Sequence, residues 1–145
     1  MTLYLQTNCH QFLLRKVLYL LPVLLLGGAC PLFGQVNADA VFVPISKYIY
    51  EGDAEKLSAW FYDTVELSVE NEDAVMSRNQ AYRMMGAFFE RHRPESFQIY
   101  HSASKSSVKC VVGKMVAGGE NYNVSIFASN RGDGYMIQKL QIQKE

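Results

Sequence analysis

Residues 77–99 read S-R-N-Q-A-Y-R-M-M-G-A-F-F-E-R-H-R-P-E-S-F-Q-I, and within them the spacing of apolar side chains changes from helical to alternating. The first four residues form an S-x-x-Q capping box, in which serine and glutamine satisfy backbone N–H groups at a helix start. Apolar residues then recur at helical spacing until Pro94, which cannot continue a helix. The stretch therefore predicts a helix followed by a strand. Arg91, His92 and Arg93 form a basic helix end that complements the helix dipole.

From Ser96 onward the apolar residues alternate with polar ones, which is the period of a β-strand. Four such runs follow one another, at 97–101, 108–112, 122–126 and 136–142. Gly118 and Gly119 predict a tight hairpin between the second and third runs, because glycine adopts the positive φ that such turns require. A longer turn at 130–134 precedes the fourth run. The sequence thus predicts four antiparallel strands.

Two helices and a strand are predicted before Ser77. Asp39 is the expected cap of the first helix and Gly52 its stop, while Asp53 is the expected cap of the second. The buried faces are predicted to be Val41, Ile45, Tyr48 and Ile49 in the first helix and Leu57, Trp60 and Phe61 in the second. Residues 65–69 alternate as a strand does, and residues 74–76 are a candidate short strand. This order predicts an α+β fold in which helices cover one face of a curved sheet.

The first 35 residues have the layout of a signal peptide. They contain no acidic residue, and Arg15 and Lys16 precede an apolar run at 17–26. This run is too short for a membrane-spanning helix, which needs about 20 apolar residues. We therefore expect residues 1–35 to be removed, leaving a single domain at 36–145 that is periplasmic or secreted. Gly28-Ala29-Cys30 leaves one alternative open, a lipoprotein anchored to the membrane at Cys30.

Composition excludes several classes of protein. The 145 residues carry 14 basic and 14 acidic side chains, so no excess positive charge is available to attract nucleic acid. Of the three cysteines only Cys110 lies in the body of the domain, and no internal disulfide can form. The apolar context V-K-C-V-V predicts that Cys110 is a core residue rather than a reactive thiol. No metal-ligand spacing and no cofactor motif occurs, so neither a metal nor a cofactor is expected.

Three segments resemble those of a known family: V-P-I-S-K-Y-I at 43–49, G-D-A-E-K-L-S-A-W-F at 52–61 and G-D-G-Y-M-I-Q-K-L-Q-I at 132–142. Over roughly residues 39–143 the chain resembles exported bacterial proteins grouped as domain of unknown function 4783. That family is similar to the nuclear transport factor 2-like superfamily, which implies a cone-shaped fold with three helices packed on a strongly curved, mainly antiparallel sheet. The superfamily includes isomerases, dehydratases, ligand binders and non-catalytic adaptors, and the family has no assigned activity. The resemblance therefore implies a fold and no catalytic residue.

Positions expected to line the cone are apolar and aromatic, without a convergent pair of charges, which favours binding over turnover. We expect a non-catalytic module that binds a small apolar ligand in its cavity or a partner protein on its sheet. The candidate ligand-binding residues are Tyr48, Trp60, Met85, Phe88, His101 and Tyr122.

Two alternatives stay open. A small isomerase or dehydratase would use His101, which strand alternation turns inward with Phe97 and Ile99, and would need a carboxylate within reach of the imidazole. Because no Asp or Glu lies in the inward strand positions, we expect His101 to be structural or exposed. The second alternative is a homodimer formed through the outer face of the sheet, on an exposed apolar patch of Tyr100, Val111, Met115 and Phe127.

Overall fold

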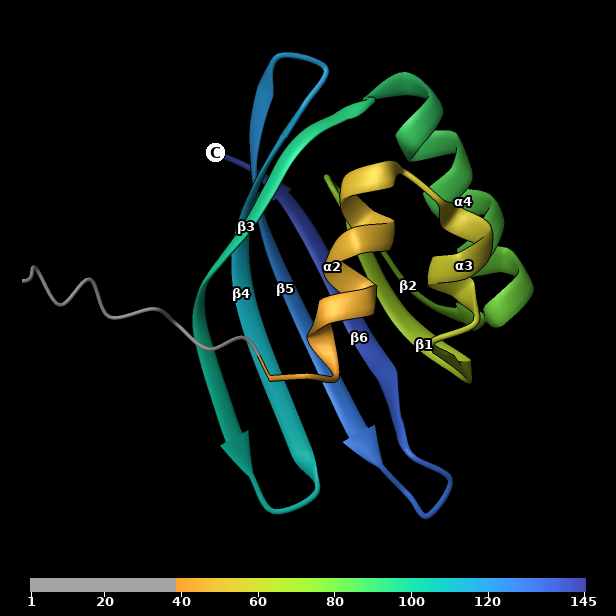
Figure 1. Ribbon diagram of the computed structural model, residues 1–145. Helices are drawn as coiled ribbons and strands as arrows, with labels where there is room; N and C mark the ends of the chain where they lie inside the picture. The colour runs from red at the N-terminus through yellow and green to blue at the C-terminus, as the bar shows by residue number, and fades with distance from the viewer. Residues whose placement is uncertain (1–38) are drawn as a thin grey trace, which may run out of the picture. The chain divides into compact units, whose positions relative to one another are not determined.

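The computed structural model describes residues 39–145, which form an α+β fold with the predicted order of elements (Figure 1). The helices are α2 (Phe42–Glu51), α3 (Ala54–Ser58) and α4 (Arg78–Arg91). The strands are β1 (Phe61–Val69), β2 (Glu72–Ser77), β3 (Pro94–Lys105), β4 (Val108–Ala117), β5 (Glu120–Asn130) and β6 (Tyr135–Lys144). The predicted signal peptide at 1–35 and the alternative lipidation site at Cys30 lie outside the described residues. Within the described part, none of the helices combines the length and apolar character that crossing a membrane requires.

Local hydrogen bonds fix the starts of α4 and α3. The complete capping box is present at α4, where the Ser77 hydroxyl accepts from the Gln80 backbone N–H and the Gln80 side chain accepts from the Ser77 backbone N–H. Asp53 caps α3 by accepting the Lys56 N–H at 2.9 Å. Both caps are as predicted, because they depend only on residues within one turn of each other.

The start of α2 differs from the prediction and its end agrees with it. Val41 rather than Asp39 holds the cap position, and its side chain makes no capping bond. Asp39 instead forms the turn in front of the helix, with its carboxylate accepting the Val41 N–H and its carbonyl accepting the Phe42 N–H. Gly52 ends α2 in the left-handed region at a φ of 67°, a conformation that costs glycine little.

The six strands form one sheet in the order β2-β1-β6-β5-β4-β3. All neighbours are antiparallel except β1 and β6, which are parallel. The last strand, β6, therefore joins the β1–β2 hairpin to the β3–β5 meander. The three helices lie on one face of this curved sheet (Figure 1), which confirms the predicted fold class.

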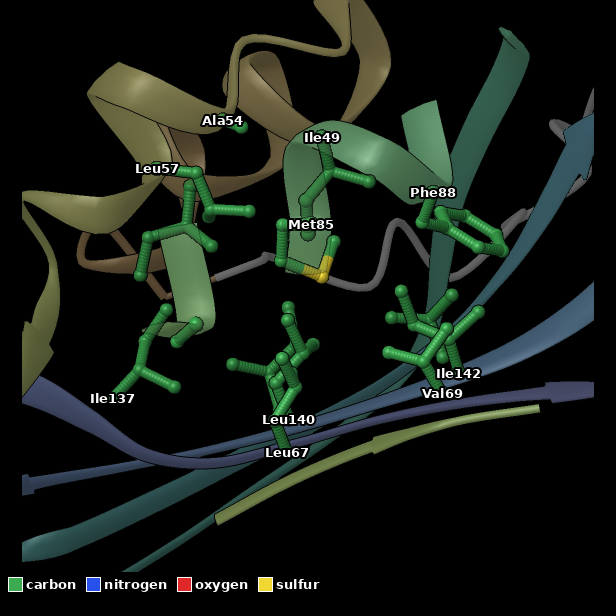
Figure 2. Packing of buried hydrophobic residues seen from close by; sticks show 14 of the residues in the cluster. Ile49, Ala54, Leu57, Leu67, Val69, Met85, Phe88, Ile137, Leu140 and Ile142 are labelled. Atoms are coloured by element: carbon green, nitrogen blue, oxygen red, sulfur yellow. The ribbon is translucent and has the colours of Figure 1, made fainter. Parts of the chain in front are cut away.

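The helices bury only part of the apolar faces that their sequence spacing predicts, since Val41 and Tyr48 of the first predicted face are half-buried. Ile45 and Ile49 of α2 are fully buried, and the buried residues of α4 are Ala81, Met85, Phe88 and Phe89. Figure 2 shows Met85 pointing toward Leu140 and Leu67, and Phe88 pointing toward Ile142 and Val69. Tight packing between α4 and the sheet follows, because these side chains have essentially no exposed surface.

The predicted burial of Trp60 is wrong. α3 ends at Ser58, so Trp60 and Phe61 do not share a helical face with Leu57. Phe61 is the first residue of β1 and is fully buried, whereas Trp60 sits in the connecting turn and is half-buried. Its backbone joins two elements, because its N–H donates to the Leu57 carbonyl and its carbonyl accepts the Ile137 N–H.

A bulge in β3 breaks the strand alternation that the enzyme alternative needs to turn His101 inward, so the expectation that His101 is structural or exposed agrees with the structure. Ile99 pairs with Gly113, but His101 pairs with Val112, so one extra residue is inserted between Ile99 and His101. An inserted residue turns the later side chains of a strand to the opposite face of the sheet. His101 is accordingly exposed.

The predicted outer apolar patch is also wrong, because β4 presents its other set of residues to the helices. Val111 and Met115 belong to the core and are fully buried. Cys110, predicted as a core residue, is half-buried, and burial raises the pKa of its thiol. Apolar residues occupy both faces of V-K-C-V-V, so its alternation does not identify the inner face. Of the patch, Tyr100 is exposed and Phe127 half-buried.

Candidate functional site

The six predicted ligand-binding residues are only partly brought together. Met85, Phe88 and Tyr122 are buried in one cluster, in which the Phe88 and Tyr122 rings meet edge to face at 5.4 Å. Tyr48 and Trp60 are half-buried against the core, and exposed His101 lies beyond the bulge of β3. Three of the six thus pack together, and His101 is separate from them.

Beside the buried three lies a chain of polar contacts, here called the Glu70–His92–Tyr122 cluster. The Tyr122 hydroxyl is 3.3 Å from His92 Nδ1, and His92 Nε2 is 3.6 Å from a Glu70 carboxylate oxygen. The His92 ring also lies 5.1 Å from the Phe88 ring. Tyr122 is 1% exposed, whereas the His92 and Glu70 side chains are 25% and 33% exposed. The cluster therefore runs from the core to the surface.

Three different elements hold the cluster in place. His92 caps the C-terminal end of α4, where its N–H donates to the Phe88 carbonyl at 2.8 Å. Tyr122 projects from β5. Glu70 occupies the turn between β1 and β2 at a φ of 57°, and its N–H donates to the Ile142 carbonyl of β6 at 2.8 Å. The β1–β2 turn is thereby fastened to the centre of the sheet.

The contacts within the cluster differ in kind. The Tyr122 hydroxyl is within hydrogen-bonding distance of His92 Nδ1, and the His92 tautomer decides which of the two groups donates. At 3.6 Å the contact with Glu70 is too long for a direct hydrogen bond. Burial, followed by the negative charge of Glu70, raises the pKa of Tyr122, which keeps its hydroxyl protonated at neutral pH.

A polar cleft opens beside this cluster. Its volume is about 420 Å³, and it is lined by Glu70, Asn71, Gln143 and Lys144. The Lys144 ammonium forms an ion pair with Glu120 at 3.0 Å, and this contact raises the pKa of Lys144. A smaller cleft of about 170 Å³ shares Glu70 and Asn71 with the first and adds Glu72 and Arg91. Glu70 therefore borders both clefts.

The family comparison agrees with the fold. Residues 42–143 match the model of the family described as domain of unknown function (DUF4783). The chain belongs to the DUF4783 family. A comparison with curated proteins gives no match.

Solved structures place the DUF4783 domain among nuclear transport factor 2-like folds. A DUF4783 family protein from Bacteroides uniformis is 24% identical, with a TM-score of 0.68 over 70% of this chain and 94% of that chain. One from Bacteroides ovatus is 20% identical, with a TM-score of 0.68 over 71% and 94%. A ketosteroid isomerase-like protein from Erwinia carotovora atroseptica is 13% identical, with a TM-score of 0.63 over 72% and 91%. At these identities the likeness concerns the fold.

Sequence reasoning missed two of the three residues in the cluster of this DUF4783 domain. No sequence motif singles out Glu70, and His92 is recognisable only as part of a basic helix end. The two residues lie in different elements, and no local spacing motif connects them. Among residues 39–145 of the DUF4783 domain, no group of three or more His, Cys, Asp or Glu side chains is arranged to hold a metal ion.

Proposed function

We propose that this DUF4783 domain is an exported, non-catalytic binding module that holds a small ligand in the polar cleft beside Glu70. The observation that carries the proposal is a contrast between interior and surface. The predicted interior ligand residues Met85, Phe88 and Tyr122 are packed against one another, whereas the cleft offers about 420 Å³ lined by polar side chains. This volume falls in the range of small-molecule sites, about 300 to 1,000 Å³.

The filled interior argues against an apolar ligand between α4 and the sheet. Phe88 contacts Tyr122 in the middle of that space, and both side chains are essentially without exposed surface. A ligand there would have to displace side chains from a close-packed core, which is costly. The cleft can take up a ligand without moving the core.

Glu70 is suited to hold such a ligand because its backbone is anchored to β6 and its carboxylate lies beside His92. The anchor is the hydrogen bond from its backbone N–H to the Ile142 carbonyl. A carboxylate that is already oriented loses little conformational entropy when it binds. The proposal therefore makes Glu70 the principal contact of the ligand.

Native mass spectrometry of the protein isolated after expression of the full chain tests the proposal. We expect a bound small molecule in the wild-type protein, its loss in Glu70→Gln, and its retention in Glu55→Gln, an exposed control on α3. A ligand that stays bound in Glu70→Gln, or that is lost in Phe88→Leu instead, contradicts the cleft as the site.

The mass of the same protein also tests export. Removal of the first 35 residues or lipidation of Cys30 changes this mass, whereas the mass of an intact chain contradicts export.

A second candidate function is a small isomerase or dehydratase. The observation that favours it is that His92, rather than His101, has both a carboxylate and a tyrosine beside it. In an isomerisation or dehydration, the Glu70 carboxylate would act as the base that removes a proton from the substrate, and His92 would hold this carboxylate in position. Incubation with a panel of enolisable and dehydratable compounds separates the two functions. Turnover that falls in Glu70→Gln but not in His101→Ala supports the enzyme, and recovery of every compound unchanged supports the binding module.

A further inference from the structure

The cleft beside Glu70, counted together with Glu120, carries more negative than positive charge among the described residues when His92 is neutral. Lys144 is the cation that lines the cleft, and it is already paired with Glu120 at 3.0 Å. His92 touches Glu70 at 3.6 Å but carries a charge only when it is protonated. With His92 neutral, the group formed by Glu70, Glu120 and Lys144 has a net charge of −1.

The smaller cleft, which shares Glu70 and Asn71, does not change this balance. It adds one acidic side chain, Glu72, and one basic side chain, Arg91, whose charges cancel. The Arg91 side chain donates to the Ala87 carbonyl of its own helix at 3.3 Å. The residues that line the two clefts, counted together with Glu120, therefore keep a net negative charge while His92 is neutral.

Neutral hydrogen-bond acceptors accompany this charge. Asn71 and Gln143 also line the cleft, and each carries a side-chain amide. Each amide oxygen can accept a hydrogen bond, and the Glu70 carboxylate can accept several. The cleft thus offers at least three acceptors around one negative charge.

We infer that the ligand of this cleft carries a primary ammonium group. A primary ammonium has one positive charge and three N–H donors, which matches one carboxylate and two amide oxygens. A Ca²⁺ or Mg²⁺ ion fits less well, because such ions take six or more oxygen ligands and the described residues contain no metal-binding group of three acidic or His or Cys side chains. The volume of about 420 Å³ leaves space for an organic body attached to the ammonium.

This inference rests on the proposed binding function, and its test distinguishes the two. Three four-carbon probes carry head groups of different charge: n-butylamine is positive, 1-butanol is neutral and butyrate is negative. Each is titrated into the isotope-labelled protein while the backbone resonances of Glu70, Asn71 and Gln143 are followed by NMR. We expect n-butylamine to bind at least about tenfold more tightly than either other probe, since a charged hydrogen bond adds about 1.5 to 3 kcal/mol.

Two variants are expected to change the affinity for n-butylamine in opposite directions. Glu70→Gln should weaken n-butylamine binding at least about tenfold, because it removes the carboxylate of the cleft. Lys144→Gln should strengthen n-butylamine binding about two- to fivefold, because Glu120 loses its ion-pair partner and its negative charge then also attracts the ammonium. The Lys144 side chain is 52% exposed, so this variant keeps its fold. Glu55→Gln on α3 is the matched control and should change nothing.

The outcomes separate the two proposals. Equal or tighter binding of butyrate or 1-butanol, or weaker n-butylamine binding in Lys144→Gln, overturns the ammonium assignment and leaves the binding function standing. If none of the three probes shifts the resonances of the cleft and no small molecule copurifies with the protein, both proposals fail.

Discussion

The phenolic hydroxyl of Tyr122 lies 3.3 Å from Nδ1 of His92, and this contact joins the core to the polar surface. Tyr122 is nearly inaccessible to water, so its hydroxyl depends on a partner within the protein. The edge-to-face contact of Tyr122 with Phe88 places the same ring in the centre of the core.

Tyr122→Phe should lower the free energy of unfolding by about 1 kcal/mol, the usual net contribution of one hydrogen bond. The ring and its packing stay, and only the hydroxyl is lost. Urea denaturation measures the change, with Tyr82→Phe as control because Tyr82 is exposed on α4. Equal stability of the two variants would show that the hydroxyl contributes nothing.

Phe88→Ala should cost about 3 to 5 kcal/mol, because a fully buried aromatic side chain is replaced by a cavity between α4 and the sheet. Trp60→Ala should cost clearly less, since Trp60 is only half-buried. Both values come from the same denaturation experiment. An unchanged denaturation midpoint for Phe88→Ala would mean that another face of α4 meets the sheet.

Glu70→Gly should be more stable than Glu70→Ala by about 1 kcal/mol. Both variants lose the carboxylate, but only alanine keeps a Cβ at a φ of 57°, where left-handed backbone costs about 1 to 2 kcal/mol. Thermal unfolding of the two variants isolates this backbone effect. A more stable alanine variant would contradict the left-handed turn.

His101→Ala should change the free energy of unfolding by less than about 1 kcal/mol and leave ligand binding in place. The bulge in β3 puts this imidazole in water, away from the cleft. Thermal unfolding and native mass spectrometry of the same sample measure both properties. Loss of the copurifying ligand in this variant would show that the ligand site includes His101 and does not lie beside His92.

The ion pair between Asp39 and Lys109 should make stability depend on pH in the acid range. The hydrogen bond from Lys109, together with the Val41 N–H, lowers the pKa of Asp39 below its ordinary value of 3.8. The folded state therefore favours the ionised carboxylate, and this contribution is present above pH 3.8 and lost as the pH falls through the lowered pKa. Asp39→Asn should lower the melting temperature by a few degrees at pH 7, and the difference should shrink in acid.

The matched control for that series is Asp63→Asn. Asp63 also forms an ion pair, with Arg78 at 3.0 Å, but its side chain is 98% exposed. Exposed ion pairs contribute little to stability. A pH profile of Asp63→Asn that matches that of Asp39→Asn would assign the acid dependence to general charge effects.

Features set by neighbouring residues could be predicted from the sequence. The capping box of Ser77 and Gln80, the stop at Gly52 and the apolar face of α4 all depend on residues within a few turns of one another. The Gly118-Gly119 hairpin was predictable for the same reason, since both glycines have positive φ. Local hydrogen bonds and helical spacing are enough for such features.

Features that depend on strand register could not be predicted. The bulge before His101 reverses the inner and outer faces of β3, and no residue type in Q-I-Y-H marks it. The contact between Glu70 and His92 requires the β1–β2 turn to reach the end of α4, which only the assembled sheet defines. For this reason the sequence pointed to His101 and missed the cluster.

The position of β6 between β1 and β5 has a consequence for how the chain is made. Within the described residues, the middle of the sheet is the last strand that a ribosome delivers. Until it arrives, the β1–β2 hairpin and the β3–β5 meander have no strand to share, and an isolated hairpin is at best marginally stable in water. The sheet can therefore be completed only after β6 is available, which makes the pairing of β1 and β5 with β6 a late step in folding.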